Sequence, residues 1–136
     1  VDWVPFKGAI DAGVGAIMIA HLNIPFLEPS GKPTSLSRKV IQEILRDQWG
    51  YEGLVITDAL NMKGAAAFAP PGELELAAFT AGNDILLFPM NVPKATKAFR
   101  NALAKDKISI RSLDERVRRI LVAKSNCRAH ADWLEA

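Results

Sequence analysis

The stretch Gly53-Leu54-Val55-Ile56-Thr57-Asp58 decides the fold class of this protein. Its aliphatic and β-branched residues predict a short strand that is buried on both faces, as in a parallel sheet. A second such run, residues 16–20, leads directly into His21. The C-terminal ends of parallel strands form the functional edge of α/β proteins, so we expect Asp58 and His21 to share one site. The alternative role for Asp58 is to cap a following helix, because Asp is a favoured N-cap residue.

Helices are expected between and after these strands. The spacing of apolar residues predicts helices near 6–13, 37–49, 73–81, 95–103 and 112–121. Ser37 suits the N-cap of the second helix, and Gly50 suits the position just after its end. The stretch Ser112-Leu113-Asp114-Glu115 fits a capping box for the last helix. A third buried strand is expected at residues 85–88, where Pro89 stops it.

Strands that alternate with helices predict right-handed βαβ units and a parallel sheet, and hence an α/β fold. Three strands are few for a self-sufficient α/β domain, and a (β/α)8 barrel needs eight. The pattern therefore favours a partial TIM barrel. The chain begins at Val1 without an initiator Met, which agrees with a piece of a longer protein.

Composition excludes several classes of function. The 136 residues are 49% hydrophobic and 24% charged, with a net charge of +2, as in one ordinary globular unit. The basic residues are interleaved with acidic ones, so no nucleic-acid footprint is expected. No run approaches the roughly 20 apolar residues that span a membrane. The single cysteine, Cys127, excludes an internal disulfide and a cysteine metal framework, and no adjacent base supports its use as a nucleophile.

Five segments together resemble glycoside hydrolase family 3, and most closely its bacterial β-N-acetylglucosaminidase branch. They are AIMIAHLNIP (16–25), TSLS (34–37), LRDQWGYEGLVITDALNM (45–62), AGNDILLFP (81–89) and DERVRRIL (114–121). The most specific of them joins a helix, a Gly-aromatic-x-Gly turn, a strand and a terminal Asp. The resemblance extends to about Lys124, whereas the tail 125–136 diverges from the family.

The resemblance implies that this chain is the last three strand-helix units of the family's catalytic (β/α)8 barrel. It implies that Asp58 is the nucleophile of a retaining hydrolase that forms a covalent glycosyl-enzyme. Asp58-Ala59-Leu60 follows the glucosaminidase pattern, since β-glucosidases usually place Trp after the nucleophile. Ala20-His21 also suits that branch, because the glucosidase counterpart of His21 tends to be Tyr. His21 would then be a wall of the sugar pocket, or alternatively a histidine that only bonds the sheet end.

Two parts of the family's machinery are absent from the sequence: the Asp-His pair that supplies the acid/base, and a Lys-His motif that grips the sugar. The other histidine, His130, lies in the divergent tail. We therefore expect a nucleophile-bearing fragment that acts on an N-acetylglucosamine-containing carbohydrate, without metal or organic cofactor. Alone it should be inactive and prone to self-association. The alternatives are a non-catalytic sugar-binding or assembly module and a family 3 β-glucosidase, and both the bacterial cytoplasm and the periplasm remain open as its compartment.

Overall fold

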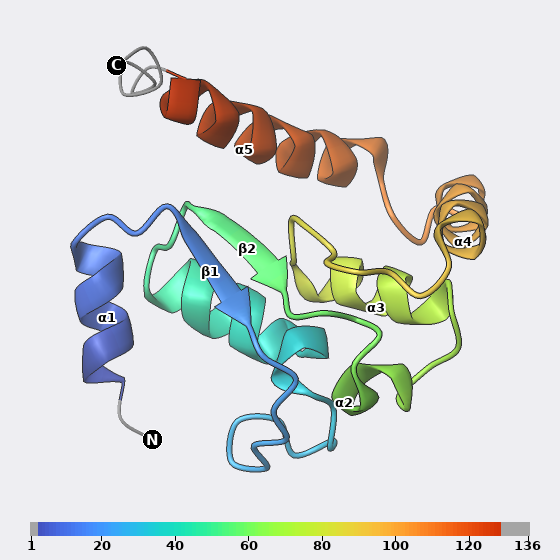
Figure 1. Ribbon diagram of the computed structural model, residues 1–136, viewed down its shortest axis with the longest axis horizontal. Coiled ribbons are helices and arrows are strands. Elements are labelled where there is room, and N and C mark those ends of the chain that lie inside the picture. Colours follow the sequence, from blue (N-terminus) through green and yellow to red (C-terminus); the bar gives the residue numbers. More distant parts are fainter. Residues whose placement is uncertain (1–2, 129–136) are drawn as a thin grey trace, which may run out of the picture.

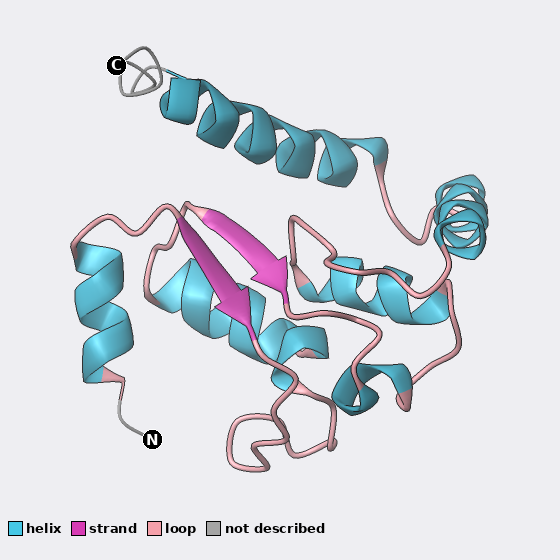
Figure 2. Ribbon diagram, in the orientation of Figure 1, coloured by secondary structure: helices cyan, strands magenta, loops and turns pink. Residues whose placement is uncertain are grey.

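The computed structural model describes residues 3–128, and two parallel strands lie at its centre with helices around them (Figure 1). Helices, including a 3-10 turn and a π-helix, make up most of the described chain (Figure 2). In chain order the elements are α1 (Val4–Asp11), β1 (Ala16–Ile19), the 3-10 helix η1 (Thr34–Leu36), the π-helix η2 (Lys39–Gln48), β2 (Leu54–Thr57), α2 (Lys63–Ala66), α3 (Glu73–Ala81), α4 (Val92–Ala104) and α5 (Ile110–Arg128). The sequence did not predict η1 and α2.

The sheet confirms the α/β class. β1 and β2 pair in parallel, with Ala16 opposite Leu54 and Ile19 opposite Thr57. The connection between them runs through η1 and η2, because parallel neighbours need a long crossover. The first two predicted strands and the helix between them are therefore correct.

The third predicted strand is only partly formed. Ile85 makes one parallel β-bridge to Ile56, and its carbonyl accepts the Thr57 N–H at 3.0 Å. The ladder then stops because the Leu87 N–H donates to the Thr57 hydroxyl, at 2.9 Å, instead of to a strand carbonyl. Phe88 has a positive φ of 45°, which no strand residue adopts. Residues 85–88 thus lie beside β2 without forming a regular strand.

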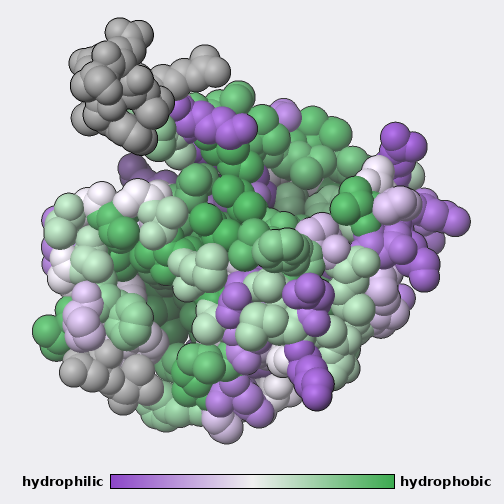
Figure 3. All heavy atoms as spheres, viewed as in Figure 1, coloured by the Kyte–Doolittle hydropathy of each residue, from purple (hydrophilic) through white to green (hydrophobic). Residues whose placement is uncertain are grey.

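The two faces of the sheet differ in burial. On one face, Val55 is fully buried in a cluster with Ile41 and Leu45 of η2, and Ile17 and Ile19 of β1 pack against this cluster. On the opposite face, Met18 is 55% exposed. Figure 3 shows apolar residues gathered on this open face, in the region between α1 and α5. Within residues 3–128, η2 therefore packs closely on one face of the sheet, and the opposite face is partly open.

The helix that joins the strands begins and ends as the sequence predicts, but it is a π-helix over Lys39–Gln48. The Ser37 hydroxyl accepts the Val40 N–H at 3.2 Å, in the manner of an N-cap, and it donates to Glu28 at 2.5 Å. Hydrogen bonds from the Ser30 and Ser37 hydroxyls lower the pKa of the Glu28 carboxyl. Gly50 follows the helix end with a φ of 65°, a conformation that glycine adopts without steric cost.

The start of the last helix corrects a prediction. α5 begins at Ile110, and the Ser109 hydroxyl accepts the Ser112 N–H at 3.1 Å. Ser109 therefore takes the capping position, while Ser112 lies inside the first turn and donates its hydroxyl to the Ser109 carbonyl at 2.7 Å. The proposed capping box at residues 112–115 is wrong, because a serine three residues earlier satisfies the first free N–H groups.

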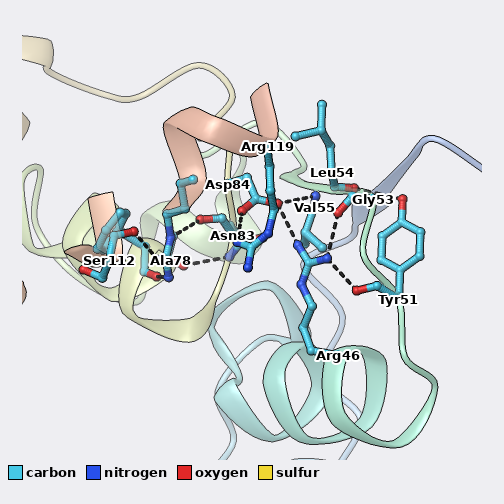
Figure 4. Close-up of polar contacts among 12 residues, drawn as sticks. Arg46, Tyr51, Gly53, Leu54, Val55, Ala78, Asn83, Asp84, Ser112 and Arg119 are labelled. Carbon is cyan, nitrogen blue, oxygen red and sulfur yellow. Dashed lines mark hydrogen bonds and ion pairs between the residues drawn. The ribbon is translucent and has the colours of Figure 1, made fainter. Parts of the chain in front are cut away.

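A buried carboxylate joins three elements at the N-terminal end of β2. Asp84 accepts the Val55 N–H at 2.8 Å, Arg46 of η2 at 2.7 Å and Arg119 of α5 at 2.9 Å (Figure 4). Arg46 also donates to the carbonyls of Tyr51 and Gly53, both at 2.7 Å. Burial lowers the pKa of Arg46, and the Asp84 carboxylate opposes that shift. The network fixes η2 and α5 to the strand.

Candidate active site

Asp58 lies at the C-terminal end of β2, one residue beyond the strand. Its N–H donates to the Ile19 carbonyl at 3.0 Å, which extends the pairing of β1 and β2 to the sheet edge. The preceding residue, Thr57, is fully buried, whereas Asp58 is half-buried. The Asp58 carboxylate therefore lies at the boundary between the buried core and the surface. This placement agrees with the prediction of a titratable group at the functional edge of the sheet.

The Asp58 carboxylate has one oxygen held and one oxygen free within the described residues. Oδ1 accepts the Ala59 N–H at 2.7 Å, and Oδ2 has no protein partner in residues 3–128. A helix cap would instead accept from an N–H two or three residues further on. Moreover, α2 begins only at Lys63, with Met62 at its N-cap position. The interpretation of Asp58 as a helix cap is therefore wrong.

The structure brings His21 to the residue that follows Asp58. His21 Nε2 lies 3.0 Å from the Ala59 carbonyl oxygen, and Nδ1 lies 2.6 Å from the Ser35 hydroxyl. A carbonyl only accepts, so Nε2 carries the hydrogen. In the neutral ring Nδ1 is then an acceptor, and the Ser35 hydroxyl donates to it. Both ring nitrogens of His21 are thus bonded within the protein.

The short helix η1 holds the residues on either side of His21 in the sequence. The Thr34 hydroxyl donates to the Ala20 carbonyl at 2.6 Å and accepts the Leu22 N–H at 3.3 Å. The Thr34 N–H also donates to the Leu22 carbonyl at 2.8 Å. Thr34 therefore holds the residue before His21 and the residue after it, while Ser35 holds the ring.

Ser35 is itself fixed from a distant segment. Asn83, fully buried after α3, donates from Nδ2 to the Ser35 carbonyl at 2.8 Å and to the Ala78 carbonyl at 2.7 Å. Sequence reasoning missed Thr34, Ser35 and Asn83 as parts of the site. The available signal was their position in segments that resemble the family, namely TSLS and AGNDILLFP.

The surroundings of Asp58 give no indication of a metal centre. Across residues 3–128 there is no group of three His, Cys, Asp or Glu side chains that could hold a metal ion. A hollow of about 760 Å³ lies elsewhere, between β2, Ile85 and the C-terminal half of α5. Cys127 borders that hollow and is exposed. His130 lies outside the described residues. The candidate catalytic residue of this chain is therefore Asp58.

The family of this chain follows from a match over most of its length. Residues 1–123 match the model of the Glycosyl hydrolase family 3 N terminal domain. The chain belongs to glycoside hydrolase family 3. This confirms the resemblance that the sequence motifs indicated.

Named relatives of this family 3 chain include glycosidases of two specificities. A beta-hexosaminidase from Chromobacterium violaceum is 38% identical over 103 residues, which cover 76% of this chain and 28% of that protein. A beta-N-acetylglucosaminidase/beta-glucosidase from Cellulomonas fimi is 29% identical over 136 residues, which cover 93% of this chain and 24% of the relative.

A solved structure of the same family has a similar fold. The family 3 beta-N-acetylglucosaminidase from Paenibacillus sp. str. FPU-7 superposes with a TM-score of 0.82 at 38% identity. The match covers 89% of this chain and 24% of that enzyme. The chain therefore spans about a quarter of the length of the relatives that it matches.

Proposed function

We propose that this chain carries the nucleophile of a retaining β-N-acetylhexosaminidase, with Asp58 as the residue that attacks the anomeric carbon. The observation that carries the proposal is the geometry of the Asp58 carboxylate. The Ala59 N–H holds Oδ1 at 2.7 Å, and Oδ2 is without a partner in residues 3–128. A nucleophile needs one oriented carboxylate with an oxygen available for bond formation. The position of Asp58 at the C-terminal end of a parallel strand supports the same role.

The reaction of a retaining glycosidase requires two carboxyl groups roughly 5–5.5 Å apart, one as nucleophile and one as acid/base. Asp58 would form the glycosyl-enzyme, and water would then hydrolyse it with retention of configuration. The acid/base and the residues that grip the sugar would come from a part of the catalytic domain outside this chain. We accordingly propose that the chain is a segment of a (β/α)8 barrel and is inactive alone.

The substrate of the proposed enzyme is a glycoside with a terminal β-linked N-acetylglucosamine. Asp58-Ala59-Leu60 and Ala20-His21 support this choice over a β-glucoside, because they follow the glucosaminidase branch of the family. His21 would lie at the wall of the sugar pocket, with both of its ring nitrogens bonded to the protein. The Cellulomonas fimi relative, whose name covers both activities, keeps β-glucosidase as the second candidate. Turnover of an aryl N-acetyl-β-glucosaminide compared with an aryl β-glucoside separates the two.

The test is made in a complete catalytic domain that contains this segment, either the encoded parent or the Paenibacillus enzyme with its matching stretch replaced. Asp58→Asn keeps the shape of the side chain and removes the charge that forms the covalent bond. We expect near-complete loss of activity on an aryl N-acetyl-β-glucosaminide, because general acid catalysis alone contributes only about 10²–10⁴-fold.

A rescue experiment distinguishes loss of the nucleophile from loss of the fold. Asp58→Gly with added azide should regain turnover and release a glycosyl azide of inverted configuration, because the small anion attacks from the face that Asp58 occupied. Retention of activity within a few-fold by Asp58→Asn would instead favour a non-catalytic sugar-binding or assembly module for this segment.

A further inference from the structure

We infer that His21 is a positioning residue for Asp58, and that Ser35, together with the Ala59 carbonyl, determines which ring nitrogen of His21 donates and which accepts. The inference rests on the proposed role of Asp58 as nucleophile. It assigns His21 a task different from contact with the sugar, because both ring nitrogens are engaged by Ser35 and Ala59. A hydrogen-bonded row therefore runs from Asn83 through Ser35 and His21 to Ala59, next to the reacting carboxylate.

The row acts on Asp58 through the backbone of Ala59. The Ala59 N–H donates to Asp58 Oδ1, and the Ala59 carbonyl accepts His21 Nε2 together with the Met62 N–H at 3.0 Å. His21 thus fixes the turn that follows the strand from the side, while the Met62 N–H closes it along the chain. With this turn fixed, the Ala59 N–H points at Oδ1 and leaves Oδ2 without a partner in residues 3–128.

The direction of each hydrogen bond follows from Ala59. Its carbonyl requires the hydrogen on Nε2, which in the neutral ring leaves Nδ1 to accept from the Ser35 hydroxyl. Ser35 is fully buried, and its carbonyl is held by Asn83, so its hydroxyl is presented to the ring by a fixed backbone. Gly64 also lies close beside His21, since a Cβ added at Gly64 would lie 3.1 Å from the His21 Cβ. These contacts hold the imidazole in one tautomer and one place.

The prediction is a fall in kcat with little change in KM, because an oriented carboxylate matters most at bond formation. Misplacement of a reacting group by about 1 Å costs up to about 100-fold in rate. Ser35→Ala removes the hydroxyl that donates to His21 Nδ1, and it adds no polar group that could contact a sugar. We expect kcat to fall about 10-fold. Ser37→Ala is the matched control, because Ser37 is equally buried and two residues away, but it bonds Glu28 and Val40 instead of His21.

Two substitutions at His21 distinguish the contributions of Nε2 and Nδ1. His21→Gln places an amide N–H near the position of Nε2 and keeps the donor to Ala59. His21→Asn reaches only the position of Nδ1 and loses that donor. We expect His21→Gln, which keeps the donor to Ala59 but has no acceptor for the Ser35 hydroxyl, to lose less kcat than His21→Asn, which loses about 10-fold, with KM near wild type in both.

The experiment measures kcat and KM for these four variants in the complete catalytic domain described above, with Asp58→Asn in the same series. The inference is confirmed when Ser35→Ala and His21→Asn lower kcat together, Ser37→Ala does not, and His21→Gln lowers kcat less than His21→Asn does. It is overturned when Ser35→Ala keeps full kcat, or when His21→Asn raises KM alone, which is the behaviour of a pocket wall. Full activity of Asp58→Asn would contradict the proposed function itself, whatever the His21 variants do.

Discussion

At the scale of single residues, Asp84 is a buried side chain whose contacts link distant parts of this family 3 chain. Its carboxylate is fully buried and accepts from Val55, Arg46 and Arg119. Arg46 is itself 8% exposed in its side chain, so its charge has little access to water. A buried charge that loses its partner is strongly destabilising, because neither the solvent nor the protein compensates it. The network lies at the N-terminal end of β2, away from Asp58, where barrel residues serve stability.

We predict that Asp84→Ala lowers the free energy of unfolding by about 3–5 kcal/mol, since it leaves Arg46 and the Val55 N–H without their acceptor. Urea denaturation, followed by circular dichroism at concentrations that keep the chain monomeric, measures the loss. Asp11→Ala is the control, because Asp11 is 62% exposed in its side chain and, among the described residues, forms its ion pair with Lys7 of the same helix. Its loss should stay below about 1 kcal/mol. Equal effects of the two substitutions would refute the role of Asp84.

At the scale of elements, the turn Gly50-Tyr51-Glu52-Gly53 connects the π-helix η2 to β2. Gly50 reverses the chain with a positive φ, and Tyr51 is buried against the strand, where its hydroxyl donates to the Leu54 carbonyl at 3.2 Å. Burial raises the pKa of the Tyr51 phenol. A Cβ at Gly53 would lie 2.3 Å from the Tyr51 hydroxyl and 2.8 Å from the Gly15 carbonyl. Glycine is therefore required at Gly53 for close approach.

We predict that Gly53→Ala destabilises the chain by about 1–3 kcal/mol, because the added methyl group forces Tyr51 or the start of β1 to move. Gly15→Ala is the control: Gly15 is the neighbour of Gly53 across the sheet, but a Cβ there meets nothing within 4 Å. Thermal unfolding of the two variants is compared with that of wild type. A drop in melting temperature for Gly15→Ala as large as that for Gly53→Ala would show that the strand start, and not the Tyr51 contact, sets the requirement.

At the scale of the whole molecule, the helices cover one face of the sheet and leave apolar side chains exposed elsewhere. Within residues 3–128 the sheet has two strands, so β1 presents an unpaired edge. Large apolar residues with more than half of their surface exposed include Val4, Phe6, Met18, Leu22, Phe26, Phe88 and Leu121. Unpaired edges and large apolar surfaces promote association between chains. None of the described helices is long and apolar enough to cross a membrane.

We predict that residues 1–136 alone self-associate at micromolar concentration, because a second copy covers the edge and the apolar surface. Sedimentation velocity over a range of concentrations measures the assembly. The control is the complete catalytic domain, in which this segment would be surrounded by the rest of the barrel and should not associate through it. A compact monomer of the isolated chain at all concentrations would contradict the prediction.

The sequence by itself determined the α/β class, the two paired strands, the positions of the main helices and the placement of Asp58 and His21 at one sheet edge. These features follow from local periodicity and from the rule that parallel strands end on the same side. Asp58 could be singled out because its signal, a buried strand followed directly by a carboxylate, lies within six consecutive residues.

Only the tertiary structure decided the contacts that link distant residues. The bond from His21 to Ala59 spans 38 residues, that from Asn83 to Ser35 spans 48, and the pair of Asp84 with Arg119 spans 35. The choice of Ser109 over Ser112 as cap and the early end of the third strand also depend on which donors and acceptors come together. Hydrogen-bond partners are selected by spatial proximity after the chain has packed, and buried polar groups must find them wherever the fold provides them. Residue order alone does not contain that geometry.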